Sequence, residues 1–292
     1  MKLGLQIVRF DWTGSPANIG PTLRDIGQAA EAAGLDSLWV MDHFFQIRGI
    51  GPVADPMLEA YATLGYLASA TARIHLGTMV TGVVYRYPGI LIKTATTLDI
   101  LSGGRAYFGV GAAWFEREAR GLGVPFPSTK SRFELLEDTL RAAHQMWAGA
   151  TQPFQGKHVH MKEPLAQPAP LTRPHPPILV GGGGERKTLR LVAQYADACN
   201  LFTGDLANMR HKLDVLRRHC DDVGRPYDEI ERTALATIAF DRSKASASRM
   251  IEDCRRWAQA GIQHLIFSMA NVHEVGLLES LGREVVPVVA EF

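Results

Sequence analysis

The chain has 292 residues, a formal net charge of +1, and a composition that is 46% hydrophobic and 21% charged. This balance excludes an intrinsically disordered chain and allows a core that needs no disulfide or metal. Nucleic-acid binding is not expected, because it draws on clustered Lys and Arg to neutralise phosphates. Membrane insertion is not expected either, because no uncharged apolar stretch approaches the ~20 residues of a transmembrane helix.

The cysteines and the first residues predict the compartment. Cys199, Cys220 and Cys254 are too few and too irregularly spaced for a disulfide framework or a C-x-x-C metal site, so we expect reduced thiols and no metal. Residues 1–6 turn polar too early for a secretory signal. The sequence therefore predicts a cytoplasmic protein.

Short apolar runs alternate with longer segments of helical periodicity along the whole chain. The expected strands cover residues 3–8, 37–41, 74–79, 106–110, 178–181, 198–202, 232–240 and 263–268. The expected helices cover residues 18–33, 57–70, 88–101, 133–147, 185–195, 209–223, 247–260 and 273–286. Apolar strands separated by helices need a parallel sheet that is covered on both faces.

Eight such pairs predict an α/β fold, a closed (β/α)8 TIM barrel formed by residues 1–292 as one domain. The alternative is an open doubly wound sheet, which places a glycine-rich phosphate loop after its first strand. Residues 9–12 are Arg-Phe-Asp-Trp, without glycine, and therefore favour the barrel.

An insertion separates the fourth and fifth strands. Residues 115–177 contain one helix and a stretch with seven prolines and three histidines, which is typical of an extended excursion and could form a lid. His158 and His160 alternate in a way that could place two imidazoles on one strand face. No nearby cysteine or carboxylate completes a ligand set, so a surface hairpin is favoured over a metal site.

Because a barrel carries its function at the carboxyl ends of its strands, the residues that follow the strands are the candidates for a site. Asp42 and His43 follow the second strand. An imidazole there can exchange a proton near neutral pH, and an adjacent carboxylate can set its tautomer. The alternative is a helix-capping Asp beside a partly buried His.

The fourth strand ends in a small-residue run, GVGAAW at residues 109–114. It lacks the third glycine of a dinucleotide fingerprint, so that interpretation is weak. Small residues here would let a flat ring approach the backbone, with Trp114 as a stacking wall. Alternatively, Gly109 and Gly111 only fit the crowded barrel interior.

The fifth strand runs into four glycines, Gly181, Gly182, Gly183 and Gly184. Consecutive free N–H groups at the start of a helix favour an anion, and Arg186 and Lys187 add positive charge. This pattern is the strongest indication of a phosphate site in the chain. The alternative is a flexible turn followed by a solvated, charged helix start.

Taken together, DHF at residues 42–44, LGTMVTG at 76–82, LDILSGGR at 98–105, GVGAAW at 109–114 and the segment 181–200 resemble the luciferase-like monooxygenase superfamily. The similarity is in order along the chain, and it is closest to the actinobacterial, coenzyme F420-dependent oxidoreductase branch. It implies a TIM barrel that holds a flavin or deazaflavin ring in its mouth, a small organic substrate and a homodimer.

The resemblance also implies roles for individual residues. Met79–Val80 takes the place of a nonprolyl cis peptide that backs the ring, and His43, beside Asp42, that of a proton donor or acceptor. Ala112 and Ala113 correspond to backbone that contacts the ring. The phosphate loop corresponds to the glycines at 182–184.

One departure bears on the substrate. The sugar-phosphate dehydrogenases of this family carry an acidic residue where this chain has Trp114, which argues against glucose 6-phosphate and for a more apolar substrate. Glu116 and Glu118 follow closely, so the substitution leaves the chemistry open.

The expected activity is hydride transfer between coenzyme F420 and a small organic substrate, with His43 handling the proton and Trp114 shaping the pocket. The compact chain favours F420 over FMN, whose branch of the family commonly carries a larger insertion. Two alternatives stay open. One is an FMN-dependent monooxygenase that uses molecular oxygen, and the other is a cofactor-binding protein without catalysis.

Overall fold

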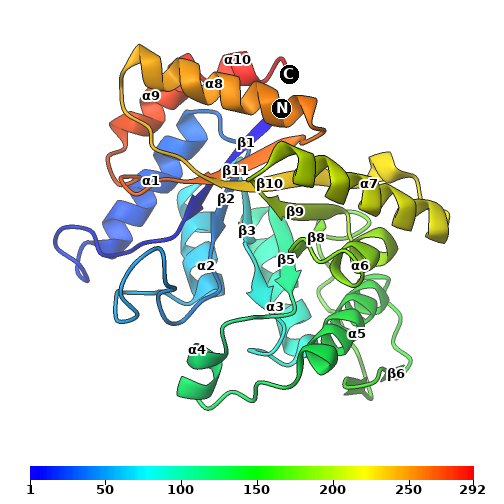
Figure 1. Cartoon of the computed structure of the whole chain (residues 1–292). Coiled ribbons are helices and arrows are strands. Elements are labelled where there is room, and N and C mark those ends of the chain that lie inside the picture. The colour runs from blue at the N-terminus through cyan, green and yellow to red at the C-terminus, as the bar shows by residue number, and fades with distance from the viewer.

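The computed structural model describes residues 1–292, and its main sheet closes into a parallel barrel surrounded by helices (Figure 1). Neighbouring strands follow the order β3-β2-β1-β11-β10-β9-β8-β5, and pairing of β3 with β5 closes the ring. The strands are β1 (Lys2–Ile7), β2 (Ser37–Val40), β3 (His75–Thr78), β5 (Ala106–Gly111), β8 (Ile178–Gly181), β9 (Ala198–Phe202), β10 (Glu231–Thr237) and β11 (His264–Ser268). The predicted TIM barrel is confirmed.

A helix follows each strand and covers the barrel from outside (Figure 1). These helices are α1 (Ile19–Ala32), α2 (Ala60–Ala70), α3 (Pro88–Ser102), α5 (Thr129–Trp147), α6 (Thr188–Tyr195), α7 (Leu206–Val223), α8 (Lys244–Gln259) and α9 (Gly276–Glu284). The last turn of the chain is α10 (Val286–Val289), and a single 3-10 turn, η1 (Tyr227–Glu229), precedes β10. No helix is long and apolar enough to cross a membrane.

Several helix starts differ from the predicted ones because a capping side chain sets them. Ser128, Asp205 and Ser243 each accept a backbone N–H of the first turn, so α5, α7 and α8 begin earlier than hydrophobic periodicity indicated. Glu59 caps α2 in the same way, so that this helix begins at Ala60, three residues after the predicted start. Capping chemistry, rather than the apolar pattern, therefore decides where these helices begin.

The strands bury their side chains on both sides, as a barrel enclosed by helices requires. Trp39, Phe108 and Phe267 are among the largest fully buried side chains. Gly109 has a structural role, because a Cβ there would lie 1.9 Å from the carbonyl oxygen of Thr78 on the neighbouring strand. For Gly109, the interpretation as a packing residue is therefore correct.

The segment between β5 and β8 contains α4 (Glu116–Gly121), α5 and a two-stranded hairpin, β6 (Phe154–Gln155) and β7 (His160–Met161). His158 lies in the hairpin turn, with its Nε2 3.0 Å from a Glu134 carboxylate oxygen. His160 pairs with the side chain of Gln155. The two histidines thus have separate partners, and the predicted surface hairpin is confirmed.

A buried polar cluster lies at the amino ends of the strands. His264 is fully buried between Ser37, whose Oγ lies 2.8 Å from its Nε2, and Glu231, whose Oε1 lies 3.4 Å from its Nδ1. Lys2 and the hydroxyl of Tyr107 each contact Glu231 at 3.0 Å. This cluster lies at the end of the barrel opposite to the candidate site.

We expect Glu231→Gln to destabilise the protein at neutral pH and much less in acid. Burial raises the pKa of Glu231, but His264 and Lys2 outweigh burial and lower that pKa to about 2. Because the folded-state pKa lies below the unfolded value, the stabilisation is present above about pH 4.5 and is lost as the pH falls towards 2. It amounts to about 3 kcal/mol at most. Urea unfolding at several pH values measures it.

The control for this substitution is Glu229→Gln, which removes an exposed carboxylate that contacts only Arg225, at 3.4 Å. Its effect on the free energy of unfolding should stay below about 1 kcal/mol at every pH. Equal losses for both variants at neutral pH would contradict the assignment.

Candidate active site

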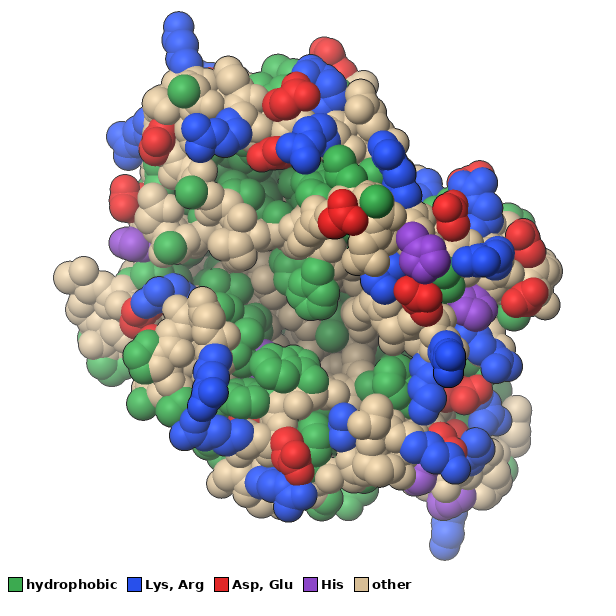
Figure 2. All heavy atoms as spheres, in the orientation of Figure 1, with side chains coloured by type: hydrophobic (Ala, Val, Ile, Leu, Met, Phe, Trp, Pro, Cys, Tyr) green, Lys and Arg blue, Asp and Glu red, His purple; other side chains and the backbone are tan.

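The carboxyl ends of the parallel strands meet at one end of the barrel and bring the predicted site residues to the same face. His43 follows β2, Val80 follows β3, Trp114 follows β5 and Gly182 follows β8. Figure 2 shows that the molecule is hollowed near the middle of the face in view, with hydrophobic side chains around the hollow.

His43 is held by a carboxylate that lies 75 positions further along the chain. Its Nδ1 lies 2.6 Å from Oε1 of Glu118 in α4. The other oxygen of Glu118 accepts the backbone N–H groups of Phe44 and Phe45, at 2.9 and 3.1 Å. The hydroxyl of Tyr85 also donates to Glu118. One carboxylate therefore fixes both the imidazole and the backbone that follows it.

Electrostatics keep Glu118 ionised although its side chain is 0% exposed. Burial raises the pKa of Glu118, but the hydrogen bonds and charge of His43 and the hydroxyl of Tyr85 outweigh burial and lower it. Burial and the adjacent Glu118 raise the pKa of Tyr85, so its hydroxyl keeps its proton and donates. Because an ionised carboxylate only accepts hydrogen bonds, Nδ1 of His43 carries a proton and Nε2 is the atom left for chemistry.

Aromatic rings border His43 on the side of the β5 loop. Trp114 and Phe115 stack with ring centroids 5.2 Å apart, and their edges approach the imidazole at 5.4 and 5.8 Å. Trp114 is 61% exposed, so most of its indole surface is free to contact a ligand. Phe202, at the end of β9, is also exposed. A flat or apolar molecule fits such surroundings.

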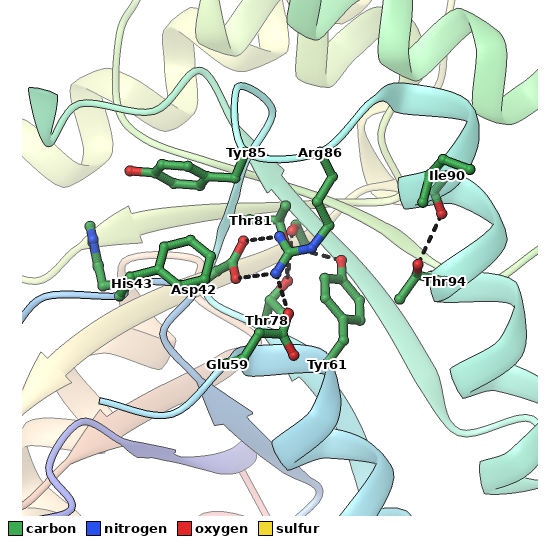
Figure 3. Close-up of polar contacts among 12 residues, drawn as sticks. Asp42, His43, Glu59, Tyr61, Thr78, Thr81, Tyr85, Arg86, Ile90 and Thr94 are labelled. Carbon is green, nitrogen blue, oxygen red and sulfur yellow. Dashed lines mark hydrogen bonds and ion pairs between the residues drawn. The ribbon is translucent and has the colours of Figure 1, made fainter. Parts of the chain in front are cut away.

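Asp42 has a different partner from the one expected. Its carboxylate, only 2% exposed, forms a bidentate pair with Arg86 at 2.7 and 2.9 Å. Figure 3 shows the carboxylate turned towards Arg86, with His43 on the far side. The expectation that an adjacent carboxylate orients His43 is therefore wrong for Asp42, because Glu118 makes that contact.

Arg86 links three segments around Asp42. Its guanidinium also pairs with Glu59 at the start of α2 and lies over the ring of Tyr61, 4.9 Å from the centroid. The Tyr61 hydroxyl bonds to Thr81 at 2.9 Å, just after the strand β3 (Figure 3). This buried network ties the loop after β3 to the end of β2, so Asp42 acts on the site through the backbone positions of its neighbours.

The peptide bond between Met79 and Val80 is cis, as the resemblance implied. Val80 projects across the ends of the next two strands of the barrel. A Cβ on Gly111 or on Gly181 would lie 2.9 Å from a methyl group of Val80. The small residues at these two strand ends therefore make room for Val80, while the carbonyl of Met79 accepts a hydrogen bond from Gln6 at 3.3 Å.

Ala112 and Ala113 directly follow β5. Ala113 is the sole non-glycine residue with a positive φ, 60°, a conformation that is uncommon for a residue with a Cβ. Nε of Arg132 in α5 donates to the Ala112 carbonyl at 3.1 Å. An observed outlier of this kind is frequent at ligand sites, where the surrounding structure holds the backbone in place.

The glycine loop is only partly available as an anion cradle. Gly182 has φ 115°, and its N–H donates to the Asn200 carbonyl at 3.0 Å. Lys212 in α7, which sequence analysis did not identify, donates to the Gly183 carbonyl at 2.8 Å and pairs with Glu185 at 3.2 Å. A lysine thus lies directly on the loop.

The helix after this loop begins at Thr188, so the predicted start at Glu185 is wrong and residues 185–187 form a turn. Arg186 and Lys187 lie in that turn and are exposed, and the ammonium of Lys187 lies 5.1 Å from the centroid of the Phe133 ring. The loop therefore combines exposed glycine backbone with three cationic side chains, including Lys212.

Comparisons with known proteins place this arrangement in a family. The model for luciferase-like monooxygenases matches residues 3–284. The chain belongs to the luciferase-like monooxygenase family. It is 30% identical over 257 residues to an F420-dependent glucose-6-phosphate dehydrogenase of Kineococcus radiotolerans, covering 87% of this chain and 73% of that protein. The enzyme of the same name from Amycolatopsis mediterranei is 26% identical, with 95% and 80% covered.

Solved structures of other proteins share the fold. An F420-dependent secondary alcohol dehydrogenase in complex with an F420-acetone adduct superposes with a TM-score of 0.82 at 18% identity, covering 99% of this chain and 98% of that one. The EDTA monooxygenase of Chelativorans sp. BNC1 has a TM-score of 0.80 at 14% identity, with 100% and 93% covered. At these identities the likeness concerns the barrel alone.

Proposed function

We propose that this luciferase-like protein is an F420-dependent oxidoreductase that transfers a hydride between coenzyme F420 and a small organic substrate. The single observation that carries the mechanism is the pairing of His43 Nδ1 with the buried, ionised Glu118 at 2.6 Å. Relatives that are named F420-dependent dehydrogenases support coenzyme F420 as the cofactor. When bound, this deazaflavin supplies or accepts the hydride.

The residues present fit a flat ring with a phosphate-bearing chain. The cis peptide Met79–Val80 would back the ring, and the backbone of Ala112 and Ala113 would lie along it. The glycines at 182–184 would approach the phosphate without steric hindrance from side chains. Arg186, Lys187 and Lys212 would add positive charge at that end of the cofactor.

His43 manages the proton that accompanies hydride transfer. Glu118 holds the proton on Nδ1, so that Nε2 faces the reacting groups as donor or acceptor. An imidazolium that forms during turnover is stabilised by the same carboxylate. Trp114 and Phe115 exclude water from one side of the imidazole and offer a flat apolar surface to the substrate. The segment 115–177, which begins with Phe115 directly after Trp114, would act as the lid.

We expect Glu118→Gln to lower turnover about 10- to 100-fold, the cost found for removing carboxylates that orient metal-ligating histidines. An amide lacks the charge that stabilises an imidazolium formed during turnover, so the turnover number should fall while the dissociation constant of coenzyme F420 changes only a few-fold. Steady-state rates and a fluorescence titration of F420 measure the two quantities. Glu116→Gln is the matched control, because Glu116 lies on the same helix and pairs only with exposed Arg120. Wild-type turnover in Glu118→Gln would contradict the role.

The proposal is tested by the choice of cofactor. Fluorescence quenching should give a micromolar or lower dissociation constant for reduced coenzyme F420 and markedly weaker binding of reduced FMN. Tight FMN binding without detectable F420 binding would overturn the proposal, and oxygen consumption coupled to reduced FMN would then support a monooxygenase. Binding of F420 without turnover on any substrate would indicate a non-catalytic cofactor carrier.

The homodimer that the resemblance implies also belongs to this proposal. Ile90 and Leu101 are strongly exposed on α3, and their spacing of three helical turns places them on one stripe of the helix. A stripe of this kind suits an isologous contact with a second copy. Light scattering should show a dimer for the wild type and a monomer for Ile90→Asp with Leu101→Asp. Val223→Asp, at the exposed end of α7, should stay dimeric, and a monomeric wild type would refute this part.

A further inference from the structure

A cavity next to the candidate site is bordered by two arginines. It has a volume of about 440 Å³ and is lined by Gln46, Arg48, Gly51, Pro52, Val53, Phe115 and Arg117. Arg48 comes from the loop after β2, and Arg117 from the first turn of α4. Segments that follow two different strands therefore bring one guanidinium each to the same cavity.

Neither arginine has a partner within the protein. Neither guanidinium pairs with a carboxylate or donates a hydrogen bond, although acidic groups lie nearby. Glu116 pairs with Arg120 at 2.7 Å, and Glu118 is occupied by His43. Both arginines are exposed and have no neutralising partner, so the positive potential at the cavity favours the binding of an anion.

No other carboxylate on this side pairs with Arg48 or Arg117. Asp11 accepts two hydrogen bonds from the guanidinium of Arg9, at 3.0 and 2.5 Å. Asp55 lies against Gly51 and acts electrostatically on the same Arg9, without an ion pair to either cavity arginine. The two guanidinium groups at the cavity therefore stay available to a bound anion.

The backbone around the cavity is fixed rather than loose. The side chain of Gln46 is 1% exposed, donates to the Val8 carbonyl at 2.9 Å and accepts the N–H of Ile47 at 2.8 Å. Glu118, one residue after Arg117, holds the start of α4 against Phe44 and Phe45. Both arginines therefore extend from anchored positions, which lowers the entropic cost of ordering them around a ligand.

Phe115 connects this cavity to the reaction centre. It lines the cavity, and its ring centroid lies 5.8 Å from that of His43. We propose that Arg48 and Arg117 form an anion subsite that binds the carboxylate or phosphate group of an acidic substrate, whose reacting carbon lies beside His43. Guanidinium groups suit both anions, because their planar forks match carboxylate and phosphate oxygens. The inference deepens the proposed function, on which it rests, by naming the substrate class as small organic acids.

The test compares probes that carry an anionic group with neutral analogues that lack it. Isothermal titration calorimetry on the F420-loaded protein would use benzoate with benzamide, and glucose 6-phosphate with glucose. We expect at least one acidic probe to bind about tenfold or more tightly than its neutral partner. Tighter binding of benzoate than of benzamide would indicate that the substrates are carboxylic acids. Tighter binding of glucose 6-phosphate than of glucose would indicate that they are phosphate esters.

Substitutions then assign the preference to the cavity. Arg48→Ala and Arg117→Ala should each lower the affinity for the preferred acidic probe about tenfold. The double variant should bind acidic and neutral probes with equal affinity. Arg120→Ala, on the same helix but paired with Glu116, should leave the preference intact. F420 affinity should be the same in all variants.

Two results would overturn the subsite. One is equal affinity, or absence of binding at millimolar concentration, for the acidic and neutral members of both pairs. The other is an acidic preference that survives in the double variant. Failure of the proposed function is a separate result, because the wild type would then not bind F420, while the charge preference can still be titrated without the cofactor.

Discussion

We expect His43→Ala to lower the turnover number with coenzyme F420 by about 10²- to 10⁴-fold, the usual contribution of a positioned general acid or base. Alanine removes the Nε2 that handles the proton but leaves the cis peptide, the glycine loop and the cationic side chains untouched. The dissociation constant of F420 should therefore change only a few-fold. Absorbance assays of F420 turnover and fluorescence titration of binding measure the two quantities separately.

Two comparisons make this result specific to the proton step. His160→Ala removes an exposed hairpin histidine that contacts only Gln155, and should leave turnover unchanged. Adding Glu118→Gln to His43→Ala should cost little further turnover, because the imidazole that Glu118 orients is already gone. A variant that keeps wild-type turnover over a panel of substrates would show that His43 does not handle the proton.

The architecture was largely predictable because it depends on patterns that are local in the sequence. Buried parallel strands are continuous apolar runs, and their helices show a 3.6-residue period, so all eight βα pairs were found. The errors lie where an interaction other than apolar periodicity sets the start or end of an element. Side-chain caps move the starts of α2, α5, α7 and α8, and β10 ends at Thr237, before the predicted residue 240. The six-residue α4 is too short to show periodicity.

The candidate site was predictable only in part, because its polar pairs join distant segments. His43 follows a strand in sequence, so its place at the barrel mouth follows from topology. The partner of His43 is Glu118 rather than Asp42 because Asp42 pairs with Arg86. Arg86 lies 44 positions from Asp42 along the chain, so the sequence does not show this pairing. The one sequence feature that points to Glu118 as a site residue is its position shortly after the fourth strand. For Lys212, the sequence shows only an amphipathic helix.

The largest loss of stability is expected for Arg86→Met. Methionine keeps most of the side-chain volume but leaves the carboxylate of Asp42 buried without its cation, at a cost of about 3–5 kcal/mol in the free energy of unfolding. Burial raises the pKa of Asp42 even when Arg86 is present. Because the folded-state pKa lies above the unfolded one, protonation in mild acid relieves the penalty, so the loss should shrink as the pH falls. Urea unfolding at several pH values tests this.

A double substitution separates the missing charge from the missing packing. Adding Asp42→Asn to Arg86→Met removes the uncompensated carboxylate and should recover a large part of the lost stability, whereas additive losses would show that packing dominates. Arg24→Met, which breaks an exposed pair with Asp25, should cost less than about 1 kcal/mol. Arg86 also anchors the loop that carries Tyr85, whose hydroxyl contacts Glu118. In the double variant this loop has no attachment to Asp42 or Glu59. Turnover should therefore stay low even though the stability is largely recovered.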